Sequence, residues 1–263
     1  MRNLFLLLFL FGNCSNYCQS KKIKAEKISS TALQADSFIG FDVLGNCYFI
    51  KGDRFFKKNP NESFEYKNIS LGKIAKVDIQ NPLKIVLFYE NFNTIILLDN
   101  QLNETQKINF SESPIPIVVA ATGIASQNQL WIYNRLDQQI GLFNYLKNNY
   151  NPISTPFPEN IKHYQSAFNY FCWIDNKNNW YACDIFGRIT PKGKIPDFDL
   201  IEIIDNHQII YSKNAVLFFE DIDKKEKHII EIAEKTFKNF YYKDQILSIF
   251  TSEGIINYKI TTP

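Results

Sequence analysis

The stretch that decides the fold is NPLKIVLFYENFNTIILLDNQL, residues 81–102. Two nearly uninterrupted apolar runs, residues 83–89 and 94–98, lie on either side of a short connection. That connection cannot carry a parallel crossover, which needs about a dozen residues, so the runs must form an antiparallel hairpin. Apolar side chains occupy both alternating faces of the first run, for example Leu87 and Phe88. The hairpin is therefore expected to be covered on both sides.

Further copies of the same sheet are the expected cover. Helices are the alternative, but only residues 229–240 show apolar residues at helical spacing, and one helix cannot cover several sheets. The pattern of an apolar strand, a turn and a second apolar strand recurs, and its copies begin near Gly45, Leu83, Asn128, Asn169, Asn206 and Asp244. The mean spacing is roughly 40 residues, which suits one four-stranded propeller blade. We therefore predict an all-β, six-bladed β-propeller of four-stranded antiparallel blades.

The ends of the chain are expected to close the ring. The last copy stops after its third strand, residues 254–260, and so lacks a fourth. Residues 22–30 stand before the first copy with no partner of their own. Because an unpaired strand edge invites aggregation, propellers commonly complete the last blade with an N-terminal strand. We predict that residues 22–30 pair with residues 254–260.

The first twenty residues have the order of a secretory signal peptide. Arg2 precedes an apolar core, residues 4–11, and small or polar residues follow it. Cleavage is expected near Ser20, which leaves residues 21–263 as a single propeller domain. Two alternatives stay open: an anchoring helix, for which the core is short, and a lipoprotein modified at Cys14, for which Asn13 is a poor preceding residue.

Charge and composition exclude some partner classes. The chain has 29 Lys and Arg against 27 Asp and Glu, so loss of Arg2 with the signal leaves 28 − 27 = +1. Such a balance does not favour nucleic acid or an anionic membrane surface. No transmembrane span is expected after signal removal, and a monomer is expected. No Gly-rich loop or other cofactor motif is present, so no cofactor is expected.

The repeats resemble those of secreted bacterial β-propellers with degenerate repeats of the NHL or YVTN kind. Residues 81–102 and the segment DIFGRI, residues 184–189, are similar to segments of envelope propellers without an assigned activity. The chain departs from the WD-repeat type, because it has no recurring Trp-Asp dipeptide and no Gly-His pair. The resemblance implies a scaffold, and propellers host both enzymes and binding proteins.

Residues with catalytic or metal-binding chemistry are scattered through the copies. The histidines, His163, His207 and His228, lie in different copies without metal-ligand spacing, so no metal site is expected. No serine lies in a nucleophile motif, so no catalytic residue is assigned. Propeller lactonases and glycosidases place carboxylates around the channel. Acids near the first strands that could converge in this way are Asp42, Asp78 and Asp205.

Loops between the second and third strands supply the candidate binding residues. Loops carry function more often than strands do, and the candidates are Phe92, Asn93, Arg135, Asp137, Asp175 and Trp180. Phe92 and Trp180 adjoin turns and are expected to be exposed. Trp131 and Trp173 lie inside strands and are expected in the core.

Signal cleavage leaves three cysteines, Cys47, Cys172 and Cys183. If the hairpin that follows Asn169 turns around Lys177 and Asn178, Cys172 lies directly opposite Cys183, at a separation that a disulfide tolerates. We predict this bridge, with Cys47 free and buried. The alternative is a register slip of one residue, which would leave both thiols reduced and on opposite faces.

The sequence favours a non-enzymatic binding or assembly module of the cell envelope. The expected location is the periplasm or the exterior, with association to the outer membrane left open, and the expected partner is another envelope protein. A carbohydrate-active or lactonase-like enzyme is the leading alternative, and a purely structural subunit is the third.

Overall fold

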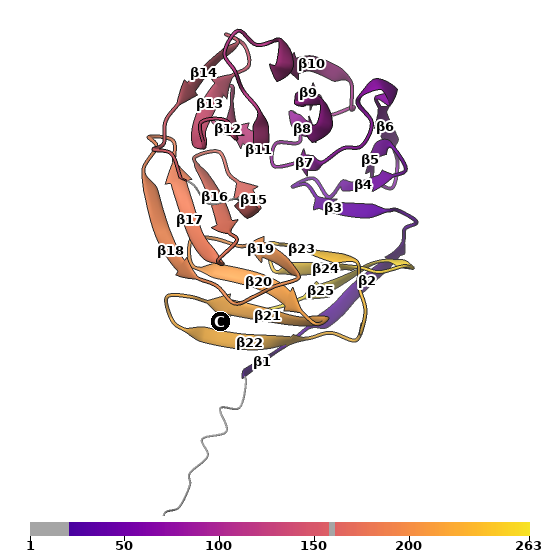
Figure 1. The fold of residues 1–263 in the computed structure, drawn as a ribbon. Coiled ribbons are helices and arrows are strands. Elements are labelled where there is room, and N and C mark those ends of the chain that lie inside the picture. The colour runs from indigo at the N-terminus through magenta and orange to yellow at the C-terminus, as the bar shows by residue number, and fades with distance from the viewer. Residues whose placement is uncertain (1–20, 158–160) are drawn as a thin grey trace, which may run out of the picture.

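The computed structural model describes residues 21–157 and 161–263, and they form six β-sheets arranged as blades around a central axis (Figure 1). The predicted propeller is confirmed. The strands of each blade are given from the axis outward. Blade 1 is β3 (Ser37–Phe41), β4 (Cys47–Lys51), β5 (Arg54–Lys58) and β6 (Ser63–Lys67), and blade 2 is β7 (Lys76–Asp78), β8 (Ile85–Tyr89), β9 (Thr94–Leu98) and β10 (Glu104–Asn109). Blade 3 is β11 (Val119–Ala125), β12 (Gln129–Asn134), β13 (Gln139–Asn144) and β14 (Asn149–Pro152).

Blades 4 to 6 complete the ring. Blade 4 is β15 (Ile161–Ser166), β16 (Tyr170–Asp175), β17 (Asn179–Asp184) and β18 (Ile189–Lys194). Blade 5 is β19 (Leu200–Ile203), β20 (Gln208–Lys213), β21 (Val216–Asp221) and β22 (Glu226–Glu231), with β1 (Lys21–Lys24) as a fifth strand. Blade 6 is β23 (Asn239–Lys243), β24 (Ile246–Phe250), β25 (Gly254–Lys259) and β2 (Glu26–Ala32).

The opening stretch forms the middle hairpin of blade 2. Every residue of β8 and β9 is buried, because the two faces of this hairpin serve two different cores. Ile85 and Leu87 pack with blade 1, whereas Val86 and Phe88 pack with blade 3. Leu83 lies outside the strand and is exposed. Residues apolar on both faces are therefore what a blade held between two neighbours requires.

The same type of turn between neighbouring strands occurs three times. In each copy an Asp lies four residues before an Asn and accepts its hydrogen bonds. Asp42 accepts hydrogen bonds from the backbone N–H groups of Leu44 and Asn46 and from Asn46 Nδ2. Equivalent bonds join Asp99 to Asn103 and Asp175 to Asn179. A carboxylate that satisfies several donors in this way stabilises a tight connection. Asp42 and Asp175 are thus structural turn residues.

Residues 21–32, which we call the N-terminal clasp, bridge two blades. β2 pairs antiparallel with β25 and completes blade 6, which confirms the predicted closure for residues 26–30. The expected partner of residues 22–24 was wrong, since β1 pairs in parallel with β22 of blade 5. The reason is Ile23, the one apolar side chain of β1, which is buried in the core that blades 5 and 6 share.

The segment with helical spacing, residues 229–240, contains the end of β22 and the start of β23 and no helix. The helices of the described ranges are three short 3-10 turns, η1 (Ile69–Leu71), η2 (Glu90–Phe92) and η3 (Phe110–Glu112). Within the described part of the chain, no helix is both long and apolar enough to cross a membrane. The expected signal peptide, its cleavage site at Ser20 and Cys14 lie outside the described residues.

Candidate functional site: the mouth of the channel

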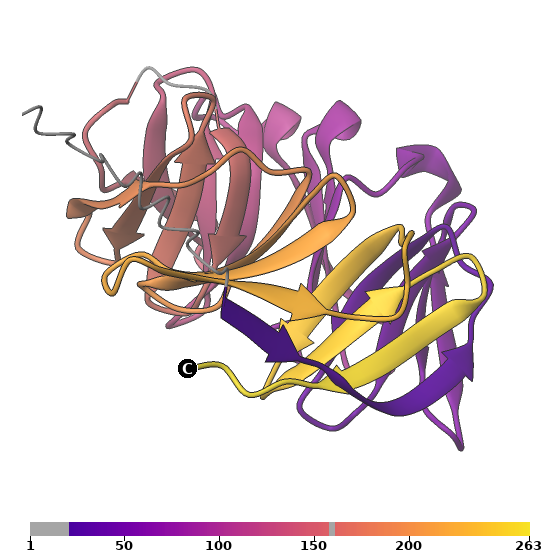
Figure 2. The same cartoon turned by 90° about the horizontal axis from the view of Figure 1, so that it is seen from below.

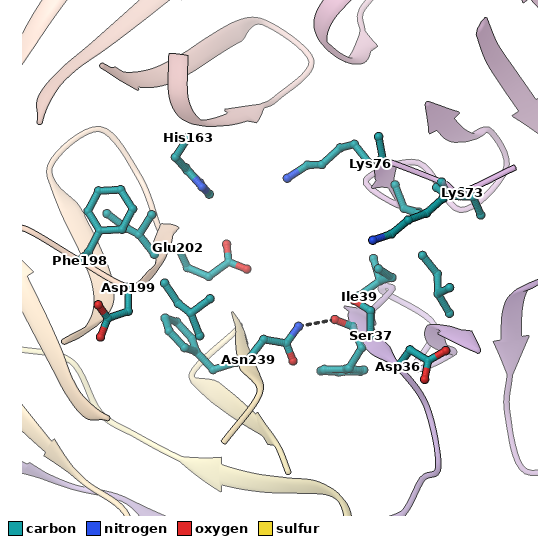
Figure 3. A pocket seen from close by; sticks show the side chains of 18 of the residues that line it. Asp36, Ser37, Ile39, Lys73, Lys76, His163, Phe198, Asp199, Glu202 and Asn239 are labelled. Atoms are coloured by element: carbon teal, nitrogen blue, oxygen red, sulfur yellow. Dashed lines mark hydrogen bonds between the residues drawn. The ribbon is translucent and has the colours of Figure 1, made fainter. Parts of the chain in front are cut away.

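The main candidate site is a cavity of about 920 Å³ where the innermost strands begin. Neighbouring innermost strands run in the same direction, so their first residues gather at one end of the ring, which we call the channel mouth. Side chains from five blades line it, as Figure 3 shows for Ser37, Lys76, His163, Glu202 and Asn239. This convergence places residues distant in the sequence around one space.

Two lysines supply positive charge to the channel mouth. Lys73 precedes β7 and Lys76 begins it, and both ammonium groups point into the cavity (Figure 3). Neither ammonium group has a carboxylate partner within ion-pair distance among the described residues. Lys76 Nζ lies 5.1 Å from the centre of the Tyr164 ring, a favourable cation–π contact. The charge of both lysines is therefore open to a ligand.

Glu202 faces the lysines from β19 (Figure 3). Burial raises the pKa of the Glu202 carboxyl to about 7, although the charge of Lys76 opposes this shift. Desolvation has this direction because it disfavours the charged form of an acid. Glu202 therefore changes charge near neutral pH.

His163 and Asn239 add buried polar atoms. Burial, together with the charge of Lys76, lowers the pKa of His163 to about 3, so the imidazole is neutral above pH 5. Its Nε2 has no hydrogen-bond partner among the described residues. Asn239 Nδ2 donates to the carbonyl of Phe38 at 2.6 Å, while its Oδ1 lacks a donor within the described ranges. Both are therefore buried polar atoms beside the channel mouth that have no bonding partner within the described ranges.

The other charges at the rim are paired with protein groups. Asp197 accepts from Lys162 at 3.2 Å and from Lys213 at 2.6 Å, and Lys213 also lies 3.4 Å from Asp199. Asp36 accepts the backbone N–H of Gly52. Among the described residues, the lining charges without an oppositely charged partner within ion-pair distance are thus those of Asp36, Lys73, Lys76 and Glu202.

Asp78 is the last residue of β7 and lines a second cavity together with Glu202 and Tyr241. Its Oδ2 accepts the Ile124 N–H at 2.8 Å and the Ser166 hydroxyl at 3.2 Å, which ties blades 2, 3 and 4 together. Gly123 allows this approach, because a Cβ there would lie 1.8 Å from Ser166 Oγ. Burial raises the pKa of Asp78. The three acids considered for catalysis do not converge, since Asp42 and Asp205 accept backbone N–H groups of strand turns.

The candidate binding residues divide into surface and structural groups. Phe92 is 48% exposed at η2, and Arg135 Nη2 reaches Glu90 Oε1 at 3.0 Å across two blades. Asn93 accepts the Val119 N–H and donates to the Ile117 carbonyl, and Asp137 accepts the Gln139 N–H. The last two residues therefore order loops.

The exposure predicted for Trp180 is wrong, since the side chain is fully buried in the core between blades 4 and 5. Asp175 is also fully buried and holds the preceding turn. Trp131 and Trp173 lie in the core, as predicted. Trp180 was misplaced because both faces of a middle strand are covered, so nearness to a turn does not bring exposure.

His207 and His228 lie away from the channel. His207 is half exposed and pairs with Asp223, while His228 is buried in β22. Among the described residues, no three His, Cys, Asp or Glu side chains are grouped so as to hold a metal ion.

The predicted bridge between Cys172 and Cys183 is wrong. In the hairpin of β16 and β17, Cys172 lies opposite Ala182, and Cys183 lies opposite Phe171. The connection is centred on Lys177 alone, because Asp175 receives the N–H groups of Lys177 and Asn179. That odd loop shifts the register by one residue. The two thiols therefore face different cores and are free, as is the half-buried Cys47.

We expect thiol titration of denatured, unreduced protein comprising residues 21–263 to count three free thiols. In the native protein the reaction should be slow, because burial raises the pKa of Cys172 to about 11 and that of Cys183 to about 12, which leaves little thiolate. A count of one free thiol would instead support the predicted disulfide between Cys172 and Cys183.

Comparison with known protein families and with curated protein sequences found no match. Solved structures with a similar fold include the β-propeller domain of Cps50 (Swd1) from Myceliophteria thermophila, with a TM-score of 0.58, 8% identity, and coverage of 90% of this chain and 100% of that chain. Virginiamycin B lyase from Staphylococcus aureus gives a TM-score of 0.57 at 12% identity, and the match covers 85% of this chain and 79% of that chain. BBS1N, solved in complex with ARL6DN, gives a TM-score of 0.56 at 10% sequence identity, and the match covers 88% of this chain and 79% of that chain. The protein is therefore similar in fold to β-propellers.

Proposed function

We propose that the protein is a non-enzymatic binding module of the cell envelope that recognises another envelope protein through the mouth face of the propeller. The envelope location rests on the signal-like order of residues 1–20, and the affiliation with degenerate NHL or YVTN repeats rests on the pattern of the copies. We also propose that it is a monomer in the absence of its partner.

One observation carries this proposal: apolar side chains are exposed together above blades 2 and 3. We call them the mouth-face patch, and they are Ile69, Phe92, Ile115 and Leu136, with exposed fractions of 81%, 48%, 45% and 60%. The three short 3-10 helices that carry or adjoin most of them, purple to magenta in Figure 2, project from one side of the ring. A Cβ at Gly72 would lie 3.9 Å from the Phe92 ring, so η1 and η2 are close.

Charged groups adjoin the patch. The ion pair between Glu90 and Arg135 is exposed and joins the connections that carry Phe92 and Leu136. An apolar centre with a polar rim is the composition of protein-binding surfaces. A partner of matching chemistry would present an apolar anchor with neighbouring charges of both signs. The BBS1N propeller, which was solved in complex with another protein, illustrates this use of the fold.

An enzyme related in chemistry to propeller lactonases or glycosidases is the second candidate. Glu202, with its pKa raised to about 7, lies in a large cavity, as a general acid would. The similarity in fold to virginiamycin B lyase also supports this candidate. Turnover of lactone or glycoside substrates that is lost in Glu202→Gln would establish the enzyme.

We expect a photo-crosslinking amino acid at position 92 to capture the partner in intact cells. The same probe at Val43, which is 67% exposed in the turn at the far end of β3, is the matched control and should capture much less. With the probe placed instead at Leu136 of the same patch, Phe92→Ala should weaken capture by about tenfold or more, since central aromatic anchors carry most of the binding energy. Equal yields from positions 92 and 43 would contradict the proposed surface.

A further inference from the structure

We propose that the channel mouth is a binding site for an organic anion, whose oxyanion group is held by Lys73 and Lys76 and whose apolar body lies against Phe198 and Ile39. This inference goes beyond the proposed partner surface. It concerns the cavity inside the ring, whereas the mouth-face patch lies above blades 2 and 3.

The two unpaired lysines of the cavity favour an anion. Lys73 and Lys76 both extend into it without a carboxylate partner among the described residues, while the rim lysines Lys162 and Lys213 are bound to Asp197. Each of these ammonium groups attracts an anion through its charge. Lysine ammonium groups are also common ligands of carboxylate and phosphate oxygens.

The unpartnered polar atoms point to a ligand with its own hydrogen-bonding groups. His163 Nε2 and Asn239 Oδ1 are both buried in side chains that line the cavity, and neither has a partner within the described residues. Buried polar atoms are almost always hydrogen-bonded in folded proteins. Both atoms are closed to solvent in this structure, so a ligand that Lys73 and Lys76 attract meets them only after the His163 or Asn239 side chain rotates.

Size and apolar lining separate an organic anion from a simple ion. The cavity of about 920 Å³ is far larger than an inorganic phosphate and falls within the range of small-molecule sites. Phe198 lies edge-on to His163, with ring centroids 6.3 Å apart. Ile39, Ile74 and Ile201 add aliphatic surface. A flat or branched apolar body would contact these side chains while its charge meets the lysines.

Glu202 makes the site sensitive to pH. The charged and titratable side chains that line the same two cavities as Glu202 include Asp36, Lys73, Lys76, Asp78, Lys162, His163, Tyr164, Asp199, Tyr241 and Lys243. His163 stays neutral above pH 5, and burial raises the pKa of Tyr241, so neither changes charge between pH 6 and 8. Asp199 is paired with Lys213. Below pH 7 Glu202 loses its negative charge, so anion affinity should rise as the pH falls.

The test uses 8-anilino-1-naphthalenesulfonate and its uncharged counterpart N-phenyl-1-naphthylamine, measured by titration calorimetry on residues 21–263. The double variant Lys73→Met with Lys76→Met should weaken binding of the sulfonate by about tenfold or more, since a charge-assisted bond contributes about 1.5–3 kcal/mol. The exposed pair Lys107→Met with Lys147→Met is the matched control and should leave affinity unchanged. Binding of the uncharged amine should be the same in all three proteins.

Glu202→Gln should bind the sulfonate at pH 8 as tightly as the unmodified protein does at pH 6, and should lose the dependence on pH. Wild-type affinity for the sulfonate in the double variant would overturn the proposal. So would inorganic phosphate that displaces the sulfonate at equal concentration, because the site would then take a simple ion. Crosslinking from position 92 does not depend on these lysines, so failure here leaves the proposed partner surface separately testable.

Discussion

Removal of the N-terminal clasp, residues 21–32, is expected to lower the melting temperature by more than about 10 °C or to prevent folding. The clasp supplies the outer strand of blade 6, where β2 pairs with β25 through six residue pairs. At about 1 kcal/mol for each net hydrogen bond, their loss removes much of a typical domain's stability. The truncation also exposes the edge of β25, which favours aggregation.

A shorter truncation separates the two strands of the clasp. Removal of residues 21–25 deletes β1 alone and exposes the core around Ile23, which is 6% exposed in the intact protein. Loss of one buried Ile is expected to lower stability by about 2 kcal/mol and the melting temperature by about 4–8 °C. Lys21→Ser with Lys22→Ser removes the surface ion pairs with Glu226 and Glu231 and should change little. Superimposable melting curves for the intact chain and the long truncation would refute ring closure by β2.

Trp180→Ala is expected to destabilise the protein by about 4 kcal/mol, which corresponds to about 8–16 °C in melting temperature. The indole is fully buried between blades 4 and 5 with Ile174, Ile209 and Tyr211. Its removal leaves a cavity that the surrounding strands cannot close. Differential scanning calorimetry measures the effect, and Trp180→Phe should recover part of the loss.

Phe92→Ala is the control for this core substitution. Because Phe92 is 48% exposed, its truncation should change the free energy of unfolding by less than about 1 kcal/mol while it weakens partner capture. If Trp180→Ala instead abolished partner capture without a shift in melting temperature, Trp180 would belong to the binding surface, as its position beside a turn first suggested.

The architecture could be predicted from the sequence because burial on both faces leaves a distinctive pattern. The runs that became β8 and β9 are almost entirely apolar, and every position of the two strands is buried. Their repetition at a blade-sized period excludes a single half-exposed sheet. The partner of residues 22–24 was missed for a different reason. Pattern and length show that this segment needs the free edge of another strand to pair with, but blades 5 and 6 both have such an edge. Burial of Ile23 favours the edge of blade 5.

The channel mouth could not be assembled from alternation alone. In β15 the pairing register shifts between Ile161 and His163, and a similar shift occurs in β3 between Phe38 and Gly40. Such bulges reverse which side chains face the channel. A signal was nevertheless present, since Glu202 is a lone acid within an apolar first strand. The predicted pairing of Cys172 with Cys183 was wrong for a similar reason. The turn contains one residue more than predicted, so the two thiols lie on opposite faces of the blade.

The N-terminal clasp also imposes an order on biosynthesis. Ser29 and Asn257 share a hydrogen bond across 228 residues of sequence, so β2 must wait until β25 has been synthesised. Contacts of such long sequence separation form slowly, and until then both partners present open edges. An interrupted chain that lacks residues 254–259 cannot satisfy β2 and stays open to proteases and chaperones. Completion of blade 6 thus requires that residues 254–259 have been synthesised.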